Sequence, residues 1–140
     1  MDISDKALEI ARQNAIKNQV DVHFFQYDLL KDEPFAFPLF DCIAANPPYI
    51  ALKEKETMAK NVLDYEPHQA LFVPDENPLL FYERIADFAR NHLKEAGSVY
   101  LETSSLYGRA SAKVFEDKKF RSVKLLRDIS GNDRIIIAKL

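Results

Sequence analysis

Residues 40–49 read Phe-Asp-Cys-Ile-Ala-Ala-Asn-Pro-Pro-Tyr, a nearly continuous apolar run followed by a loop with two adjacent prolines. Such a run is typical of a strand that is covered on both faces of a parallel sheet. Each proline fixes its own φ angle and disfavours helical backbone in the residue before it, so the loop is extended and stiff. Ligands of open α/β sheets bind at the carboxyl ends of the strands. The sequence therefore predicts a binding corner at residues 46–49.

The residue types at this corner suit a planar NH2 group. The Asn46 side chain and the Pro47 main chain each offer a carbonyl acceptor, and the Tyr49 ring can cover the flat face of the group. Pro48 chiefly provides stiffness. A Pro-rich turn capped by an Asn is the structural alternative, and two prolines alone would favour it. The four residues in this order at a strand end favour a functional role.

The pattern along the chain predicts an α/β sandwich with a largely parallel sheet and one antiparallel strand. Residues 50–78 form a long irregular segment, and loops of this length are usually functional or mobile. Helices are expected over residues 5–18, 52–58, 79–93 and 109–117, and strands over 20–27, 40–45, 98–102, 120–127 and 134–140.

Length and composition restrict the class of protein. The 140 residues suffice for one domain, 1–140. Cys42 is a lone cysteine in an apolar run, which favours a small core residue over a reactive thiol. The three histidines have no spacing that suggests metal ligands, so no metal site is predicted. No signal peptide or membrane-spanning stretch is recognised, and a cytoplasmic protein without a membrane partner is expected.

The net charge of −3 is unevenly distributed. Residues 1–102 carry 10 Lys or Arg and 18 Asp or Glu, whereas residues 103–140 carry 9 and 4. The basic end is read as a solvated face of the last helix and hairpin. A duplex-binding enzyme needs a broad basic surface around its active site, and the loop at residues 46–49 lies in the acidic part. This disfavours a nucleic-acid substrate.

Several segments carry a resemblance to a known family. Residues 46–49 resemble motif IV of the amino-methyltransferases that use S-adenosylmethionine. The order of the other segments is similar to that of the HemK-type enzymes, which methylate a glutamine in peptide-chain release factors. These segments are Tyr65-Glu-Pro-His-Gln-Ala-Leu71, Leu80-Phe-Tyr-Glu-Arg-Ile85, Phe120 to Asp128, and Gly131-Asn-Asp-Arg134.

The resemblance implies a truncated Rossmann-like class I methyltransferase fold, S-adenosylmethionine as cofactor and release factors as protein partners. It implies that Asn46 and Pro47 accept hydrogen bonds from the NH2 group of the substrate glutamine, and that Tyr49 packs against this group. These three are the expected catalytic residues. Pro48 and Glu66 complete the expected substrate-binding set.

The resemblance also implies cofactor contacts. Asp2 matches an acidic residue that binds the ribose hydroxyls, and Asp28 with Leu29 matches a pair that brackets the adenine. Asn46 lies beside the cofactor as well. Glu102 occupies a strand end where relatives often show Glu-Ile-Gly, and there a structural role is favoured.

The chain departs from the family in its Gly-rich turn. Relatives carry a Glu-x-Gly-x-Gly turn that approaches the methionine part of the cofactor, whereas this chain has only Gly97, Gly108 and Gly131. Residues 1–3 align with the end of the family's second strand. Missing strands would expose apolar edges, so a rearranged sheet or a homo-oligomer is expected. These departures favour a chain that is inactive by itself.

Two alternatives remain open. One is a nucleic-acid methyltransferase of the N6-adenine type. The other is a non-catalytic remnant that binds no cofactor, which the lost Gly-rich turn supports.

Overall fold

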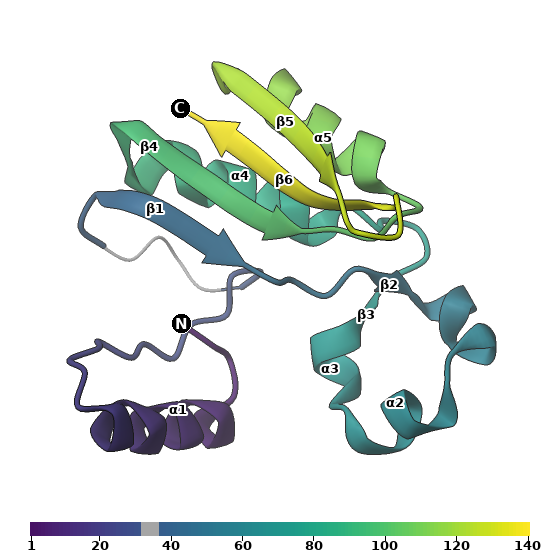
Figure 1. Ribbon diagram of the computed structural model, residues 1–140, viewed down its shortest axis with the longest axis horizontal. Helices are drawn as coiled ribbons and strands as arrows, with labels where there is room; N and C mark the ends of the chain where they lie inside the picture. Colours follow the sequence, from purple (N-terminus) through teal and green to yellow (C-terminus); the bar gives the residue numbers. More distant parts are fainter. Residues whose placement is uncertain (32–36) are drawn as a thin grey trace. The chain divides into compact units, whose positions relative to one another are not determined.

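The computed structural model describes residues 1–31 and 37–140 (Figure 1). Two compact units are present, Met1–Ala36 and Phe37–Leu140, and each is described by itself. The sequence predicts a single domain, and that expectation stays a prediction.

The first unit contains the predicted helix. Helix α1 spans Asp5–Asn18, and the Oγ atom of Ser4 accepts a hydrogen bond of 3.2 Å from the Ala7 N–H. Such a cap satisfies one of the free N–H groups of the first turn. Leu8 is the buried residue of this helix. The start of this helix could therefore be read from local sequence.

The predicted strand at residues 20–27 is wrong. The structure shows an isolated parallel bridge between Asp2 and Gln26, made by hydrogen bonds of 3.1 Å from Asp2 to Phe25 and 3.0 Å from Tyr27 to Asp2. A strand needs a partner along its length, and here the partner is a single residue. The parallel direction of the bridge matches the expected alignment of residues 1–3 with a strand end.

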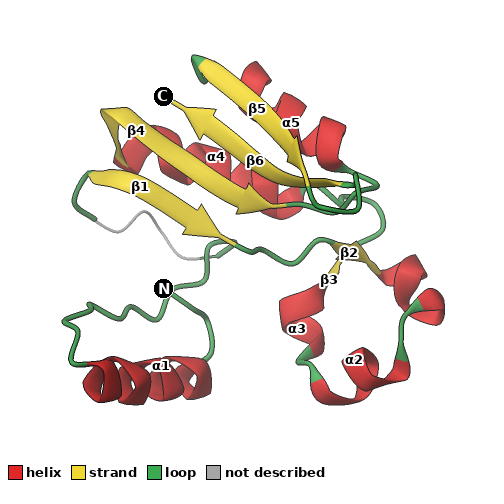
Figure 2. Ribbon diagram, viewed as in Figure 1, coloured by secondary structure: helices red, strands yellow, loops and turns green. Residues whose placement is uncertain are grey.

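The second unit is built on a four-stranded sheet, and Figure 2 shows its strands side by side. Strand β1 pairs in parallel with β4, and β6 runs antiparallel to both β4 and β5. Three strands therefore share one direction and β6 opposes them, which confirms the predicted sheet. The order is β1-β4-β6-β5, with bounds Phe40–Ala45, Leu93–Glu102, Asp133–Lys139 and Ser122–Arg127.

Helices α4 and α5 cover one face of this sheet (Figure 1). They span Leu80–His92 and Gly108–Asp117, close to the predicted bounds. Apolar side chains from both helices and from the two central strands form the core. The fully buried members with the largest side chains are Tyr82, Phe115, Leu101, Ile136 and Val99.

Strand β1 is not covered on both faces as its apolar run suggested. Cys42 is exposed, which corrects the expectation of a core cysteine. Ala44 is exposed as well, and its register partner Tyr100 on β4 is 40 % exposed. Within the second unit, successive side chains of β1 alternate between the helix-covered face and the other face. The composition of the run could not reveal that the helices of the second unit, α4 and α5, lie on one face of its sheet.

Residues 50–78 contain more regular structure than predicted. The expected short helix is a 3-10 helix, η1, over Leu52–Thr57. Two further helices, α2 at Lys60–Tyr65 and α3 at His68–Leu71, follow it. Strands β2 and β3, Ile50–Ala51 and Phe72–Val73, then pair in parallel. This pairing brings the two ends of the segment together. The second residue of each strand is buried.

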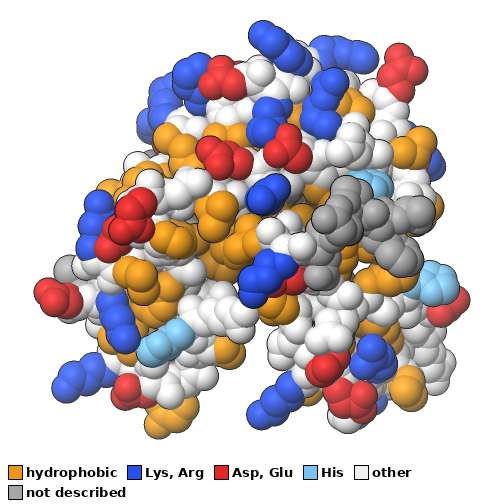
Figure 3. Space-filling model, turned by 180° about the vertical axis from the view of Figure 1, so that it is seen from behind, with side chains coloured by type: hydrophobic (Ala, Val, Ile, Leu, Met, Phe, Trp, Pro, Cys, Tyr) orange, Lys and Arg blue, Asp and Glu red, His pale blue; other side chains and the backbone are white. Residues whose placement is uncertain are grey.

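The charge asymmetry of the sequence is visible on the surface. Figure 3, seen from behind, shows Lys and Arg side chains gathered over the part of the second unit that carries α5 and β5. No helix among residues 1–31 and 37–140 is long and apolar enough to cross a membrane.

Candidate active site

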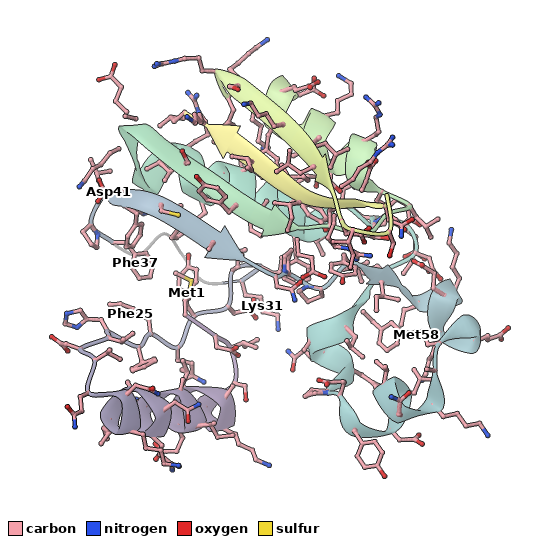
Figure 4. All side chains as sticks on the ribbon, in the orientation of Figure 1. Met1, Phe25, Lys31, Phe37, Asp41 and Met58 are labelled. Atoms are coloured by element: carbon pink, nitrogen blue, oxygen red, sulfur yellow. The ribbon has the colours of Figure 1, made fainter. Side chains whose placement is uncertain are left out.

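The loop of residues 46–49 leaves the carboxyl end of β1 and enters β2. Ala45, the last residue of β1, pairs with Leu101 of β4, so both strands end at the same edge of the sheet. Figure 4 labels Asp41 near the start of β1 and Met58 beyond η1, and the loop lies along the chain between these elements. The corner therefore has the place that ligand sites take in open α/β sheets.

Asn46 is presented outward at this corner. Its side chain is exposed, and it makes no hydrogen bond or ion pair with any residue that the structure describes. Pro47 next to it is buried, and Pro48 and Tyr49 are half-buried. The exposed Asn46 amide can therefore replace its hydrogen bonds to water with hydrogen bonds to a ligand, without breaking a contact to the described residues.

Tyr49 is held by its hydroxyl group. The hydroxyl donates a hydrogen bond of 2.7 Å to Oε1 of Glu102, the last residue of β4. Burial, followed by the hydrogen bond and the negative charge of Glu102, raises the pKa of Tyr49 to about 12. At neutral pH the side chain is therefore a neutral phenol that donates a hydrogen bond to Glu102.

Glu102 is fixed from a second side by helix α4. The hydroxyl of Tyr82, which is fully buried, donates a hydrogen bond of 3.2 Å to the main-chain carbonyl of Glu102. Burial raises the pKa of Tyr82 above its usual range, so this donor also keeps its proton. The end of β4 is thus anchored to the core beside the corner.

Arg134, at the start of β6, makes three further polar contacts near Glu102. Its Nη1 atom lies 3.8 Å from Oε1 of Glu102 and 3.5 Å from the carbonyl oxygen of Thr103. Its Nε atom donates a hydrogen bond of 3.3 Å to Oδ2 of Asp128, in the turn between β5 and β6. These three contacts connect the end of β4 to the hairpin turn.

The sequence does not predict the contacts that connect Glu102, Arg134 and Asp128. The sequence favours a structural role for Glu102 at this strand end, and residues 128 and 134 contribute there only to the resemblance. A charged residue at the end of a buried strand beside the predicted corner was the signal that could have found them. The partner charges come from a segment about thirty residues downstream and are joined to Glu102 by sheet pairing alone.

Of the predicted cofactor residues, Asn46 belongs to the second unit, and Asp2, Asp28 and Leu29 belong to the first. Asp2 is exposed, and its Oδ1 atom accepts a hydrogen bond of 2.8 Å from the Ser4 N–H. Asp28 accepts a hydrogen bond of 2.9 Å from the Leu30 N–H, and its Oδ2 atom lies 3.5 Å from Nζ of Lys31. Leu29 is half-buried. Their roles in cofactor binding stay predictions.

Glu66 lies at the junction of α2 and α3, where it follows the last residue of α2. Its side chain is exposed, and in the described part of the chain it has no hydrogen bond or ion pair with the loop of residues 46–49. The structure does not join Glu66 to the corner, so its substrate role also stays a prediction.

Known sequences similar to this chain are methyltransferases. The family model for the methyltransferase small domain matches residues 1–71. A release factor glutamine methyltransferase from Flavobacterium psychrophilum is 43% identical over 136 residues, which are 97% of this chain and 47% of that protein. Another from Bacteroides thetaiotaomicron is 42% identical over 137 residues, 98% of this chain and 49% of that protein. The chain therefore spans about half the length of the curated relatives it matches.

Solved structures show the same fold. A methyltransferase from Pyrococcus furiosus superposes with a TM-score of 0.65 at 17% identity, over 98% of this chain and 59% of that chain. TrmN from Thermus thermophilus gives a TM-score of 0.58 at 20% identity, over 98% of this chain and 34% of that chain. These likenesses confirm the predicted Rossmann-like α/β fold. With half of its length matched by the family model, the chain belongs to the methyltransferase small-domain family.

Proposed function

We propose that this chain supplies the amide-binding part of a release factor glutamine methyltransferase. The methyl group of S-adenosylmethionine would be transferred to the side-chain nitrogen of the glutamine in the Gly-Gly-Gln segment of peptide-chain release factors. The observation that carries the proposal is the exposed Asn46 side chain, which has no bond to other described residues at the carboxyl end of β1. The names of the relatives at 43% and 42% identity support the substrate class.

The corner would act by positioning the nitrogen. An amide nitrogen is a poor nucleophile because its lone pair is delocalised into the carbonyl. Acceptors on Asn46 and Pro47 would orient its two protons and align the nitrogen for attack. The Tyr49 ring would cover the amide plane, and its electron-rich face would favour a nearby positive charge. Pro48 would keep the loop stiff.

The cofactor is accommodated only in part by residues of this chain. When bound, S-adenosylmethionine supplies a methyl group on a positively charged sulfur. The exposed Asp2 carboxylate, held through the Ser4 N–H, suits the hydroxyls of a ribose. Asp28 and Leu29 would contact the adenine. A Gly-x-Gly turn for the methionine part is not present in the sequence.

The other parts of the proposal concern partners and place of action. Glu66 would help close the substrate pocket from the loop between α2 and α3. The β1 edge, paired with β4 alone among the described strands, would allow a second copy to associate. A cytoplasmic location and a lack of nucleic-acid binding complete the proposal.

Methyl transfer and cofactor binding test the proposal together. Labelled S-adenosylmethionine is incubated with the chain and either a release factor, the same factor with Glu in place of the target glutamine, or adenine-containing duplex DNA. Because the chain has no Gly-x-Gly turn, we expect weak but measurable heat of cofactor binding in calorimetry, and any label that is transferred should appear on the first substrate alone. Label on DNA would favour the N6-adenine alternative. Neither transfer nor binding would favour the non-catalytic remnant, and either outcome contradicts the proposal.

A further inference from the structure

The contacts around Tyr49 form one connected series across three distant segments of the chain. Tyr49 lies after β1, Glu102 ends β4, and Arg134 and Asp128 lie at the β5–β6 hairpin. We propose that Glu102 and Arg134 are positioning residues, which hold the Tyr49 ring against the substrate amide and are themselves fixed by Asp128 in the hairpin turn. The proposal rests on the proposed function of the corner.

Glu102 is placed to fix the direction of the Tyr49 ring. Its carboxylate accepts the phenol hydrogen bond at 2.7 Å, while Tyr82 anchors its main chain. Side-chain exposure of 34% leaves the carboxylate only partly in water, so its bond to the phenol is screened less than a surface contact. A charged acceptor makes a stronger hydrogen bond than a neutral one. Loss of this acceptor would free the ring to leave the corner.

Arg134 is held beside Glu102 by the sheet itself. Glu102 pairs with Ile135 in the antiparallel register of β4 and β6. The next bond along this ladder runs from the Thr103 N–H to the Arg134 carbonyl at 2.9 Å, and the Arg134 side chain returns to the Thr103 carbonyl at 3.5 Å. Main-chain and side-chain contacts thus hold the guanidinium beside the carboxylate, with Nη1 of Arg134 3.8 Å from Oε1 of Glu102.

Asp128 fixes the guanidinium from the turn. Its Oδ1 atom accepts hydrogen bonds from the N–H groups of Ser130 and Asn132 at 2.9 and 3.0 Å, and Oδ2 accepts from Arg134. The Asn132 N–H, the Ser130 N–H and Arg134 lower the pKa of Asp128, so it is a carboxylate at neutral pH. Gly131, between the two N–H donors, has φ +82°, which other residues rarely adopt. The turn is therefore built around this carboxylate.

The arrangement assigns Tyr49 a role without proton transfer. Its hydroxyl donates a hydrogen bond to Glu102 and keeps its proton, because a pKa of about 12 leaves Tyr49 neutral at pH 7. A raised pKa of this kind favours the folded chain below pH 10.0, the usual value, and the benefit is lost as the pH rises toward about 12. Tyr49 would thus contribute an oriented ring face, and the orientation would depend on residues of the hairpin.

The test reads the ionisation of Tyr49 in the full chain without substrate or cofactor. Tyrosine is labelled with carbon-13 at Cζ, Tyr49→Phe identifies the resonance, and spectra are followed to about pH 11, where an ordinary phenol is mostly ionised. In the wild-type chain we expect Tyr49 to remain protonated. In Glu102→Gln we expect it to titrate at lower pH, toward 10.0.

Arg134→Gln separates positioning from simple charge. The Arg134 charge lowers the pKa of Tyr49, so loss of the charge alone would raise this pKa. The hydrogen bond to Glu102 affects the pKa of Tyr49 more than the Arg134 charge does. If loss of Arg134 also moves the Glu102 carboxylate away, the pKa of Tyr49 should therefore fall. We expect the lower pKa. A raised or unchanged pKa of Tyr49 would overturn the inference.

Matched variants keep the result specific. Arg127→Gln removes an ion pair to Asp133 in the same hairpin, and it should leave the pKa of Tyr49 unchanged. An equal fall in this variant would show general loosening and overturn the inference. Asp128→Asn, which keeps an acceptor for the turn, should lower the pKa of Tyr49 as well, and it replaces Arg134→Gln if that variant does not fold.

Binding of a Gly-Gly-Gln peptide distinguishes this inference from the proposed function. If the wild-type chain binds the peptide and Arg134→Gln binds it equally well, positioning by Arg134 is contradicted while the function stands. If no variant binds the peptide, the proposed function is contradicted, and the ionisation of Tyr49 still decides whether the ring is held by the hairpin.

Discussion

Asn46→Ala is expected to weaken binding of a Gly-Gly-Gln peptide about tenfold, since it removes one well-placed hydrogen-bond acceptor. Where methyl transfer to a release factor is measured, the rate should fall roughly 100-fold or more, as for other groups that orient a reacting atom. Affinity for S-adenosylmethionine should change little, because Asn46 is proposed to act mainly on the substrate amide. Peptide titration, labelled transfer and calorimetry measure these three quantities.

Two further variants make the result specific. Asn61→Ala makes the same change at an exposed position on α2 and should leave all three quantities at the wild-type level. Asn46→Asp keeps an acceptor oxygen and should bind the peptide better than Asn46→Ala. Equal loss of cofactor and peptide binding in Asn46→Ala would contradict a role on the substrate side.

Tyr82→Ala is expected to destabilise the second unit by about 3–5 kcal/mol, the usual cost of removing a large buried aromatic side chain. Tyr82 is fully buried on α4 and also holds the end of β4 through Glu102. Since small proteins have roughly 5–15 kcal/mol of stability, a large share would be lost. Urea unfolding followed by circular dichroism gives the difference in the free energy of unfolding.

Tyr65→Ala is the matched control for this effect. Tyr65 on α2 is 85% exposed, so the same substitution should change the free energy of unfolding by less than about 0.5 kcal/mol. Tyr82→Phe should cost only about 0.5–1.5 kcal/mol, because it removes the hydrogen bond and keeps the ring. A similar loss for Tyr65→Ala and Tyr82→Ala would contradict the assignment of Tyr82 to the core.

Local signals predicted those parts of the fold that depend on neighbouring residues. Helix α1 begins at the predicted residue, directly after its Ser4 cap, and each end of α4 lies within about a residue of its predicted bound. The Asn77 side chain accepts from the Leu79 N–H at 3.2 Å, close to the predicted start of that helix. The order of strands and helices was sufficient for the fold class. The corner at Asn46 lies at the strand end where it was expected.

Features that depend on distant partners could not be read in the same way. Residues 20–27 have the composition of a strand, but one bridge through Asp2 is their pairing in the described structure. The β2–β3 pair joins segments separated by about twenty residues, each only two residues long, which is too short for a periodic pattern. Exposure of Cys42 depends on which face of the sheet carries helices. The contact of Glu102 with Arg134 depends on sheet register.

The amide resonances of Asn46 test the central claim most directly. The side-chain NH2 signals of the nitrogen-15-labelled chain are compared after addition of a Gly-Gly-Gln peptide and of a matched Gly-Gly-Glu peptide. A carboxylate has no protons to donate to the Asn46 and Pro47 carbonyls and would be repelled by nearby oxygen atoms. We expect the glutamine peptide alone to shift the Asn46 signals. Equal shifts with both peptides, or no shift with the glutamine peptide, would contradict a corner that recognises a carboxamide.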